Sequence, residues 1–207
     1  MEQISAFPVT AMLVAANLAA SFLAFSNPAF MNGNLFHVGP IVRGKEYHRL
    51  LTSGFLHGGL LHLFINMYVL WSFGSLIEGA FGPTKYLIIY FASLLGGNLW
   101  SLMENKSKPN YRALGASGAT SGIILSFTLL APFQELYIFP IPIPMPAVLL
   151  AVLFIVVSAV LAQRENKVIG HEAHLGGALV GILATIAVEP RVLSHFSEQV
   201  ARVLGGG

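Results

Sequence analysis

The chain has 207 residues, of which 55% are hydrophobic and only 10% are charged, and its mean hydropathy is +0.72. Soluble domains carry about 25% charged residues, so this composition excludes an ordinary water-soluble domain and indicates a protein of the lipid bilayer. The net charge is only +2, and the basic residues stand mostly near the ends of apolar stretches, so no nucleic-acid partner is expected. The absence of cysteine excludes a disulfide framework, a thiolate nucleophile and a cysteine-bound zinc ion.

Six apolar segments approach the length needed to cross a bilayer, which is roughly 20 helical residues. They predict an all-α membrane protein, a six-transmembrane helical bundle that forms a single domain over residues 1–207. The expected spans are Val9–Phe25, Gly54–Ile77, Thr84–Met103, Leu114–Ala131, Met145–Ala162 and Ala173–Val188. Proline, glycine and charged residues separate them. The first is read as a retained span, because Met1–Pro8 carries Glu2 and no Lys or Arg, unlike a signal peptide.

Polar side chains inside a span are costly, so each is a candidate for a functional site. The informative ones are His57, His62, Asn66, Ser117 and His174. Because successive spans alternate in direction, the second, fourth and sixth enter from one face, and Ser117 lies roughly 5 Å into the fourth. Asn66 follows His62 by four residues, so both lie on one side of the second helix. These groups are therefore expected to converge from three helices.

Ser117 stands in the sequence Gly115-Ala116-Ser117-Gly118, at the start of the fourth span. Glycines allow a sharp turn and the close approach of a substrate carbonyl group. Backbone N–H groups at a helix start have no partner within the helix, so they can bind a developing oxyanion. Serine is a weak nucleophile and needs a neighbouring base such as histidine.

Glycines recur at helical spacing beside both candidates. Gly177 and Gly181 share a face with His174, and Gly118 and Gly122 form the same small-xxx-small pattern beside Ser117. Two such faces can approach backbone to backbone, which would bring the serine within reach of the histidine. Each feature also has a structural explanation: a helix-capping serine, glycines that only pack, and His62 and Asn66 as interhelical hydrogen-bonding groups. Their joint occurrence at compatible depths favours a site.

Three motifs resemble those of the rhomboid family, in order and in helix number. His62 to Asn66 resembles its HxxxN motif, Gly115 to Gly118 its GxSG motif, and Ala173 to Gly181 its AHxxGxxxG motif. The residues Tyr47–Thr52, the additional His57, and the set Gly74, Glu78 and Gly82 also look like family patterns.

The resemblance implies an intramembrane serine endopeptidase that cleaves transmembrane or juxtamembrane segments of membrane proteins, with neither metal nor cofactor. Ser117 would be the nucleophile and His174 the general base and acid. The Ser117 N–H, His62 and Asn66 would form the oxyanion site, and His57 would support it. The implied protein is multi-pass and belongs to a bacterial inner membrane. Some family members carry an aromatic residue four positions after the serine, where this chain has Ser121.

Several alternatives stay open at this stage. A non-catalytic relative of the derlin type would bind membrane helices without cleaving them. A metal site would use His57, His62, His171 and His174, but their spacing is unlike HExxH. Ser121 is a rival nucleophile without a leading glycine. The positive-inside rule places the N-terminus outside, whereas the family resemblance implies the reverse, so membrane orientation and oligomeric state are left undetermined.

Overall fold

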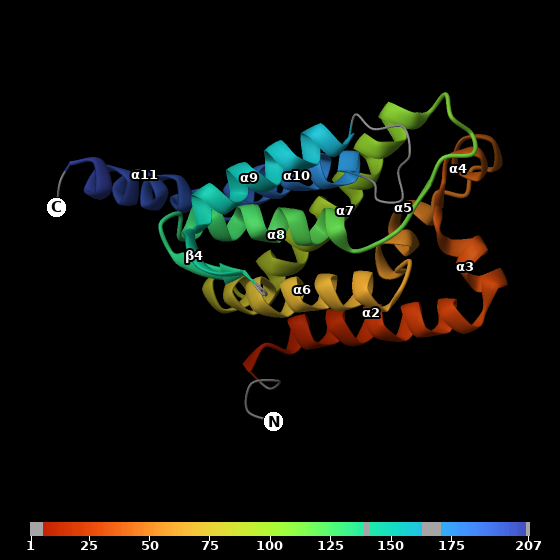
Figure 1. Cartoon of the computed structure of the whole chain (residues 1–207), viewed down its shortest axis with the longest axis horizontal. Helices are drawn as coiled ribbons and strands as arrows, with labels where there is room; N and C mark the ends of the chain where they lie inside the picture. Colours follow the sequence, from red (N-terminus) through yellow and green to blue (C-terminus); the bar gives the residue numbers. More distant parts are fainter. Residues whose placement is uncertain (1–5, 139–140, 163–170, 206–207) are drawn as a thin grey trace.

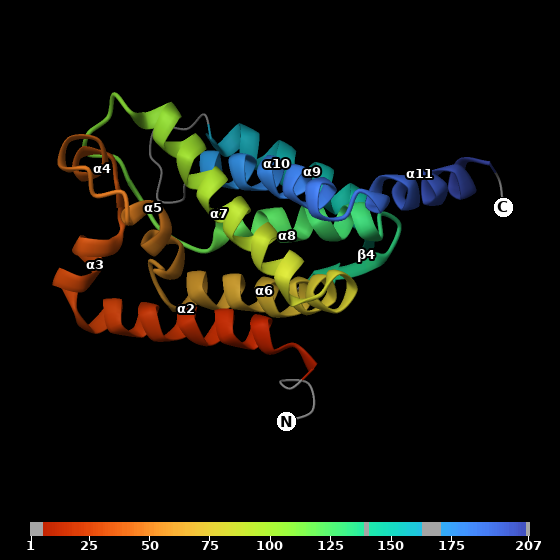
Figure 2. The ribbon, with the colours of Figure 1, turned by 180° about the vertical axis from the view of Figure 1, so that it is seen from behind.

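The computed structural model of the chain describes residues 6–138, 141–162 and 171–205, and helices dominate it. Figures 1 and 2 show a bundle in which α8 lies between α6 on one side and α9 and α10 on the other. Helix α8 contacts α6, α7, α9 and α10, so it is the central element. The predicted all-α membrane fold is confirmed. The long helices are α2 (Pro8–Ser26), α6 (Leu60–Phe81), α7 (Pro83–Asn105), α8 (Ser117–Leu130), α9 (Ala147–Ala162) and α10 (His171–Val188).

The helices differ in whether their length and hydropathy would allow each to cross a membrane on its own. Among the described residues, α2, α6 and α7 are each long and apolar enough to do so. Helix α10 meets the same criterion only when it is taken together with α11 (Arg191–Leu204), which is bent relative to it. Helix α8 has 14 residues, about 21 Å, which is shorter than the hydrocarbon core of about 30 Å. Ten of those residues are buried, because the longer helices enclose α8. This arrangement is consistent with the predicted six spans.

The predicted start of the second span was wrong by six residues. Helix α6 begins at Leu60 rather than at Gly54, and it ends at Phe81 rather than at Ile77. The preceding residues form a 3-10 turn, η1 (Ser53–Phe55), and the Ser53 carbonyl accepts a hydrogen bond from the Gly115 N–H at 3.0 Å. A distant segment therefore holds this turn in place, and Gly58 and Gly59 separate it from the start of α6.

Smaller shifts affect the other spans. Helix α8 begins at Ser117 and not at Leu114, and α9 begins at Ala147 and not at Met145. The residues before α9 instead form a hairpin of β3 (Glu135–Ile138) and β4 (Ile141–Pro146), in which alternate prolines favour extended backbone. The charged residues Arg164 and Lys167, predicted to separate the last two spans, lie outside the described residues.

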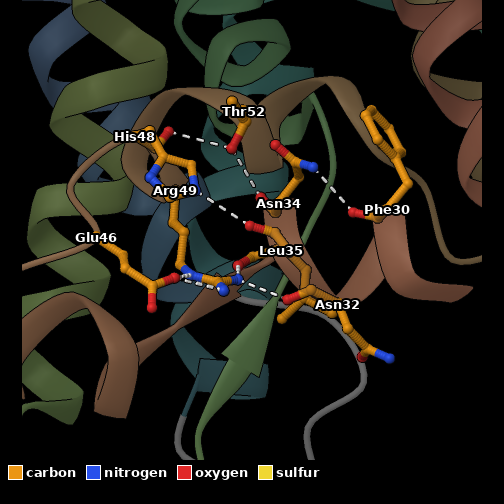
Figure 3. Close-up of polar contacts among 9 residues, drawn as sticks. Phe30, Asn32, Asn34, Leu35, Glu46, His48, Arg49 and Thr52 are labelled. Carbon is orange, nitrogen blue, oxygen red and sulfur yellow. Dashed lines mark hydrogen bonds and ion pairs between the residues drawn. The ribbon is translucent and has the colours of Figure 1, made fainter. Parts of the chain in front are cut away.

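The connection between α2 and α6 is not a plain loop. It contains α3 (Pro28–Asn34), β1 (Phe36–His37), α4 (Val38–Gly44) and α5 (Arg49–Thr52), and β1 pairs with β2 (Arg112–Ala113). Figure 3 shows the polar contacts that fold it.

Arg49 is the centre of these contacts. Its Nη1 atom donates to the carbonyls of Asn32 at 2.7 Å and Leu35 at 2.9 Å, and its Nε atom donates to Glu46 Oε2 at 2.7 Å. Thr52 Oγ1 donates to the Asn34 carbonyl at 2.8 Å. A buried guanidinium thus satisfies backbone carbonyls that have no helical partner and holds this connection on the end of the bundle that carries Ser117.

Glu78 on α6 fastens the beginning of α2. Its carboxylate accepts hydrogen bonds from the N–H groups of Val9 at 2.9 Å and Thr10 at 2.8 Å, and from the Thr10 hydroxyl at 2.8 Å. A carboxylate at this position satisfies unpaired amides and complements the positive end of the helix dipole. Glu78 is buried in α6, one residue beyond the predicted end of the second span at Ile77, and the helix end that it caps explains a glutamate at this position.

We expect Glu78→Ala to lower the free energy of unfolding by about 1–3 kcal/mol, because it leaves buried donors without an acceptor. Thermal unfolding of the purified protein in detergent would measure the loss. Glu104→Ala, which removes an exposed carboxylate from α7, is the matched control and should leave the melting temperature nearly unchanged. Equal effects of the two substitutions would contradict the capping role.

Candidate active site

Ser117 is the first residue of α8, and its side chain is partly exposed while the residues around it are buried. The chain reaches it through Gly115, whose φ of +124° lies in the region that favours glycine. Within the described residues no side chain caps this helix end. The N–H groups of the first turn, including that of Ser117, therefore have no acceptor within the helix.

Gly115 also makes room beside the serine. A Cβ atom added at Gly115 would lie 2.9 Å from His62 Nε2 and 3.7 Å from Ser117 Oγ. The imidazole and the hydroxyl therefore border the same small space, and a side chain at residue 115 would fill it. This gives two separate reasons for glycine at the head of the predicted GxSG motif.

Helices α8 and α10 meet backbone to backbone. A Cβ atom at Gly177 would overlap the carbonyl group of Gly118, and one at Gly181 would overlap the Cα atom of Gly122. A Cβ atom at Gly118 would lie 3.3 Å from the Ala173 carbonyl oxygen. Gly118 adjoins Ser117 and Ala173 adjoins His174, so the chain neighbours of the two candidate residues are in contact.

A third helix takes part in this close packing, which the sequence analysis missed. A Cβ atom at Gly97 of α7 would meet the Ala173 carbonyl, and one at Gly122 would meet the Ser93 side chain. The signal available in the sequence was the Gly96-Gly97 pair inside the third span. Farther along the contact between α8 and α10, the hydroxyls of Ser126 and Thr185 lie 2.6 Å apart.

The His62 ring can be assigned a tautomer from its neighbours. The Gly58 N–H donates to His62 Nδ1 at 3.4 Å, so that nitrogen acts as an acceptor. In a neutral imidazole the other nitrogen then carries the proton. The Nε2–H group, which faces the space beside Ser117, is thus a hydrogen-bond donor.

Asn66 lies one turn deeper on α6 and is buried. Its Nδ2 atom donates to the His62 carbonyl at 2.9 Å, and its Oδ1 atom accepts from Thr120 Oγ1 of α8 at 3.4 Å. A carboxamide has two N–H groups, so one can serve the backbone while the other serves a ligand. The amide is oriented by contacts on both helices.

His57 braces the segment that leads to the serine and is fully buried. The Ala116 N–H donates to His57 Nε2 at 3.4 Å, which leaves the proton of a neutral ring on Nδ1. Nδ1 then donates to Ser21 Oγ at 2.9 Å, and Ser21 Oγ donates to the Phe55 carbonyl at 3.0 Å. The His57 and His62 rings also touch edge to face, with centroids 5.1 Å apart.

An aromatic residue from α9 orients His174. The rings of Phe154 and His174 are stacked, with centroids 5.9 Å apart and planes 27° from parallel. Position 121, where some relatives of this type carry an aromatic residue, instead holds a buried serine whose hydroxyl donates to the Ser117 carbonyl at 2.5 Å. Phe154 was not predicted, because nothing in an apolar span distinguishes one phenylalanine from another.

Glu172 joins the start of α10 to the end of α7 and to the segment that follows it. Its carboxylate lies 3.4 Å from the Tyr111 hydroxyl and 3.5 Å from Asn105 Nδ2. Burial raises the pKa of Tyr111 to about 12, so the phenol keeps its proton and donates. This contact fixes the helix turn that carries His174.

The alternative of a histidine metal site finds no support in the described part of the chain. No group of three or more His, Cys, Asp or Glu residues with metal-binding geometry occurs among the described residues. The side chain of His171, one of the four histidines considered for a metal site, lies outside that part.

A rhomboid domain model matches residues 44–191, which is most of the chain and includes α6 to α10. The chain belongs to the rhomboid family. It is therefore an integral membrane protein with the intramembrane-protease type of fold.

Curated rhomboid relatives support this assignment. RHOMBOID-like protein 12, mitochondrial, of Arabidopsis thaliana is 32% identical over 173 residues, which are 76% of this chain and 51% of the relative. Rhomboid protein 1, mitochondrial, of Saccharomyces cerevisiae is 31% identical over 137 residues, 65% of this chain and 40% of the relative. Inactive RHOMBOID-like protein 8 of Arabidopsis thaliana is 36% identical over 86 residues, 42% of this chain and 24% of the relative. The chain thus spans about half or less of these rhomboid relatives.

We expect Gly177→Ala to separate α8 from α10, because the added methyl group would overlap the Gly118 backbone. Overpacking of this kind costs about 1–3 kcal/mol in the free energy of unfolding. Thermal unfolding in detergent would measure it. Gly33→Ala on α3, where a Cβ atom meets nothing within 4 Å, is the control and should have little effect. A Gly177→Ala protein as stable as the control would contradict the close contact.

Proposed function

We propose that the protein is an intramembrane serine endopeptidase, with Ser117 as nucleophile and His174 as general base and acid. The observation that carries the proposal is the contact between the chain neighbours of these two residues, Gly118 and Ala173. It is supported by the partly exposed serine at a helix start and by membership in the rhomboid family. Close helix approach of this kind supports the hydrogen-bond reach that a nucleophile and its base require.

The reaction proceeds in two stages. His174 removes the proton of the Ser117 hydroxyl as the oxygen attacks the carbonyl carbon of a peptide bond. The histidinium then gives its proton to the leaving amine, and an acyl-enzyme remains on Ser117. Water, activated by the neutral His174, attacks the ester, and the serine regains its proton.

The negative charge of the tetrahedral intermediate falls on the former carbonyl oxygen. The proposed donors to it are the Ser117 N–H, the His62 Nε2–H and the free N–H of the Asn66 amide. The space that His62 and Ser117 border beside Gly115 supports this arrangement. Such donors accelerate the reaction because they are already oriented before the charge develops.

The stacking of Phe154 on His174 supports a fixed ring orientation without an acidic third residue. Because Phe154 stands on α9, the histidine geometry depends on where that helix lies. The proposed substrates are transmembrane or juxtamembrane segments of membrane proteins, and the proposed partners are these substrates and the surrounding bilayer. A single catalytic domain over residues 1–207 also remains a proposal.

The membrane that holds the protein is likewise a prediction. A bacterial inner membrane was expected from the resemblance, whereas two of the relatives described above are named as mitochondrial proteins.

Cleavage of a model transmembrane substrate in detergent tests the dyad. Ser117→Ala and His174→Ala should each reduce turnover by several orders of magnitude, because the first substitution removes the nucleophile and the second removes the base that activates it. Ser121→Ala is the matched control and should retain most activity, since its hydroxyl only donates to the Ser117 carbonyl. Melting temperatures close to that of the parent protein would show that the variants are folded.

Activity that survives either dyad substitution would overturn the mechanism. A stable protein that never cleaves, and that fails to react with a fluorophosphonate at Ser117, would point instead to a non-catalytic family member. The existence of an inactive relative makes this second outcome worth testing directly.

His62→Ala should lower kcat by about 100- to 1000-fold with little change in KM, because the oxyanion exists only in the transition state. His195→Ala, which removes an exposed histidine at the far end of the molecule, is the control. Steady-state kinetics on the same substrate measure both. A variant whose KM rises while kcat is unchanged would assign His62 to substrate binding.

A further inference from the structure

Helix α11 is a separate feature of this chain, because the rhomboid match ends at its first residue, Arg191. It turns by 106° from α10 after a short break. Figure 1 shows it at the end of the bundle far from α3, α4 and α5. The Gly115 N–H bonds to the Ser53 carbonyl directly after α5, so the segment that leads to Ser117 lies at that opposite end. The catalytic proposal gives it no role.

The residues of α11 divide into two sides. At about 100° per residue, its six large apolar side chains fall within an arc of about 120°. Polar and charged side chains occupy most of the remaining circumference. The apolar set is Val192, Leu193, Phe196, Val200, Val203 and Leu204.

Only part of the apolar side is covered by the protein. Val192 is buried, and Gln199 Nε2 donates to the Leu130 carbonyl at 3.0 Å, so the helix is docked on the end of α8. Along the rest of the same side, Leu193 is 46% exposed, Val203 57% and Leu204 81%. The docked contacts fix the helix, and the exposed apolar edge is left facing outward.

A charged cluster marks the level at which α11 begins. Glu189 lies between α10 and α11, and its carboxylate pairs with Lys85 Nζ at 2.6 Å and Arg191 Nε at 2.8 Å. Hydrogen bonds from Arg191 and from Lys85 lower the pKa of Glu189 to about 2, so the carboxylate stays charged. Charged groups of this kind lie at the headgroup layer and not in hydrocarbon.

The direction of α11 follows from its bend relative to α10 and from the charged cluster at its start. Membrane helices tilt on average about 20° from the bilayer normal. A helix that turns by 106° from α10 at the headgroup layer therefore runs close to the membrane plane. Its 14 residues are too few to cross the bilayer, and its polar side covers too much of the helix for the helix to be buried in hydrocarbon.

We infer that α11 lies in the membrane–water interface on the face opposite Ser117, with Leu193, Val203 and Leu204 in the acyl-chain boundary of the leaflet. A strongly two-sided helix of low overall hydrophobicity is the type that binds a bilayer surface in this way. The occupant of the exposed edge is the same lipid that covers the apolar surfaces of α2, α6 and α7.

The basis of this contact is apolar area. Arg191 pairs with Glu189, and Arg202 lies 3.9 Å from Glu198, so both arginines of α11 have acidic partners. Vesicles without anionic lipid should therefore hold the helix as well as vesicles that contain it.

The chain has no cysteine, so single cysteines can be introduced for spin labelling without a background. The full chain with Val203→Cys or Leu204→Cys would be reconstituted in phosphatidylcholine vesicles, with and without phosphatidylglycerol. Ser194→Cys and Ala201→Cys, which lie on the opposite side of α11, are the matched controls. Collision with oxygen, which concentrates in lipid, and with a water-soluble nickel chelate would be measured.

We expect labels at residues 203 and 204 to favour oxygen over the nickel chelate several-fold more than labels at residues 194 and 201, in both kinds of vesicle. Equal accessibility of all four labels to the nickel chelate would overturn the inference. So would dipolar coupling between labels at residue 204 of different molecules, because it would show that a second copy covers the edge. A depth seen only with phosphatidylglycerol would also contradict an apolar contact.

Discussion

The contact between α8 and α10 leaves no room for a side chain at Gly177 or Gly181, and the arrangement around Ser117 depends on it. In a bilayer, lipid is as apolar as leucine, so helices gain little by burying apolar surface against one another. Small residues allow backbones to touch over a long stretch, which gains dispersion energy and fixes the distance between helices. Because this contact begins beside Ser117 and His174, the same packing that holds the bundle positions the two candidate groups.

Hydrogen bonds among buried polar groups then set the finer geometry. His57 links Ser21 of α2 to the Ala116 amide, and Ala116 precedes the serine directly. Asn66 joins its own helix to Thr120 of α8. Each of these groups would be costly if left without a partner in an apolar surrounding. A set of satisfied donors and acceptors therefore selects one arrangement of α2, α6 and α8.

The two ends of the molecule are organised by different charges. On the end that carries Ser117, the guanidinium of Arg49 is buried and bonded to backbone carbonyls and to Glu46, so its charge serves the fold of the connection. At the other end, Lys85, Glu189 and Arg191 stay near the surface where α10 turns into α11. A count of basic residues in loops treats these two situations alike.

Several features were determined by the sequence because they depend on local patterns. Long apolar runs specify helices in a bilayer whatever their neighbours are, since the backbone must satisfy its own hydrogen bonds there. Glycines repeated every four residues indicate a close helix contact, and Gly115 before a helix indicates a backbone turn that other residues avoid. The helices that carry Ser117, His174, His62 and Asn66 followed from the sequence, but the exact positions of these residues within their helices did not, because α6 begins at Leu60 and α8 at Ser117.

Other features were decided only by the tertiary structure. Residues 54–59 stay out of α6 because Ser53 and His57 bond to segments distant in the chain. Phe154 reaches His174 because α9 and α10 pack together, and no spacing within the sequence encodes which phenylalanine does so. The amphipathic pattern of α11 is local and was present in the sequence, but the bend that turns this helix along the membrane plane is not. The sequence can indicate which side chains are able to meet, whereas contacts among several helices decide which of them do.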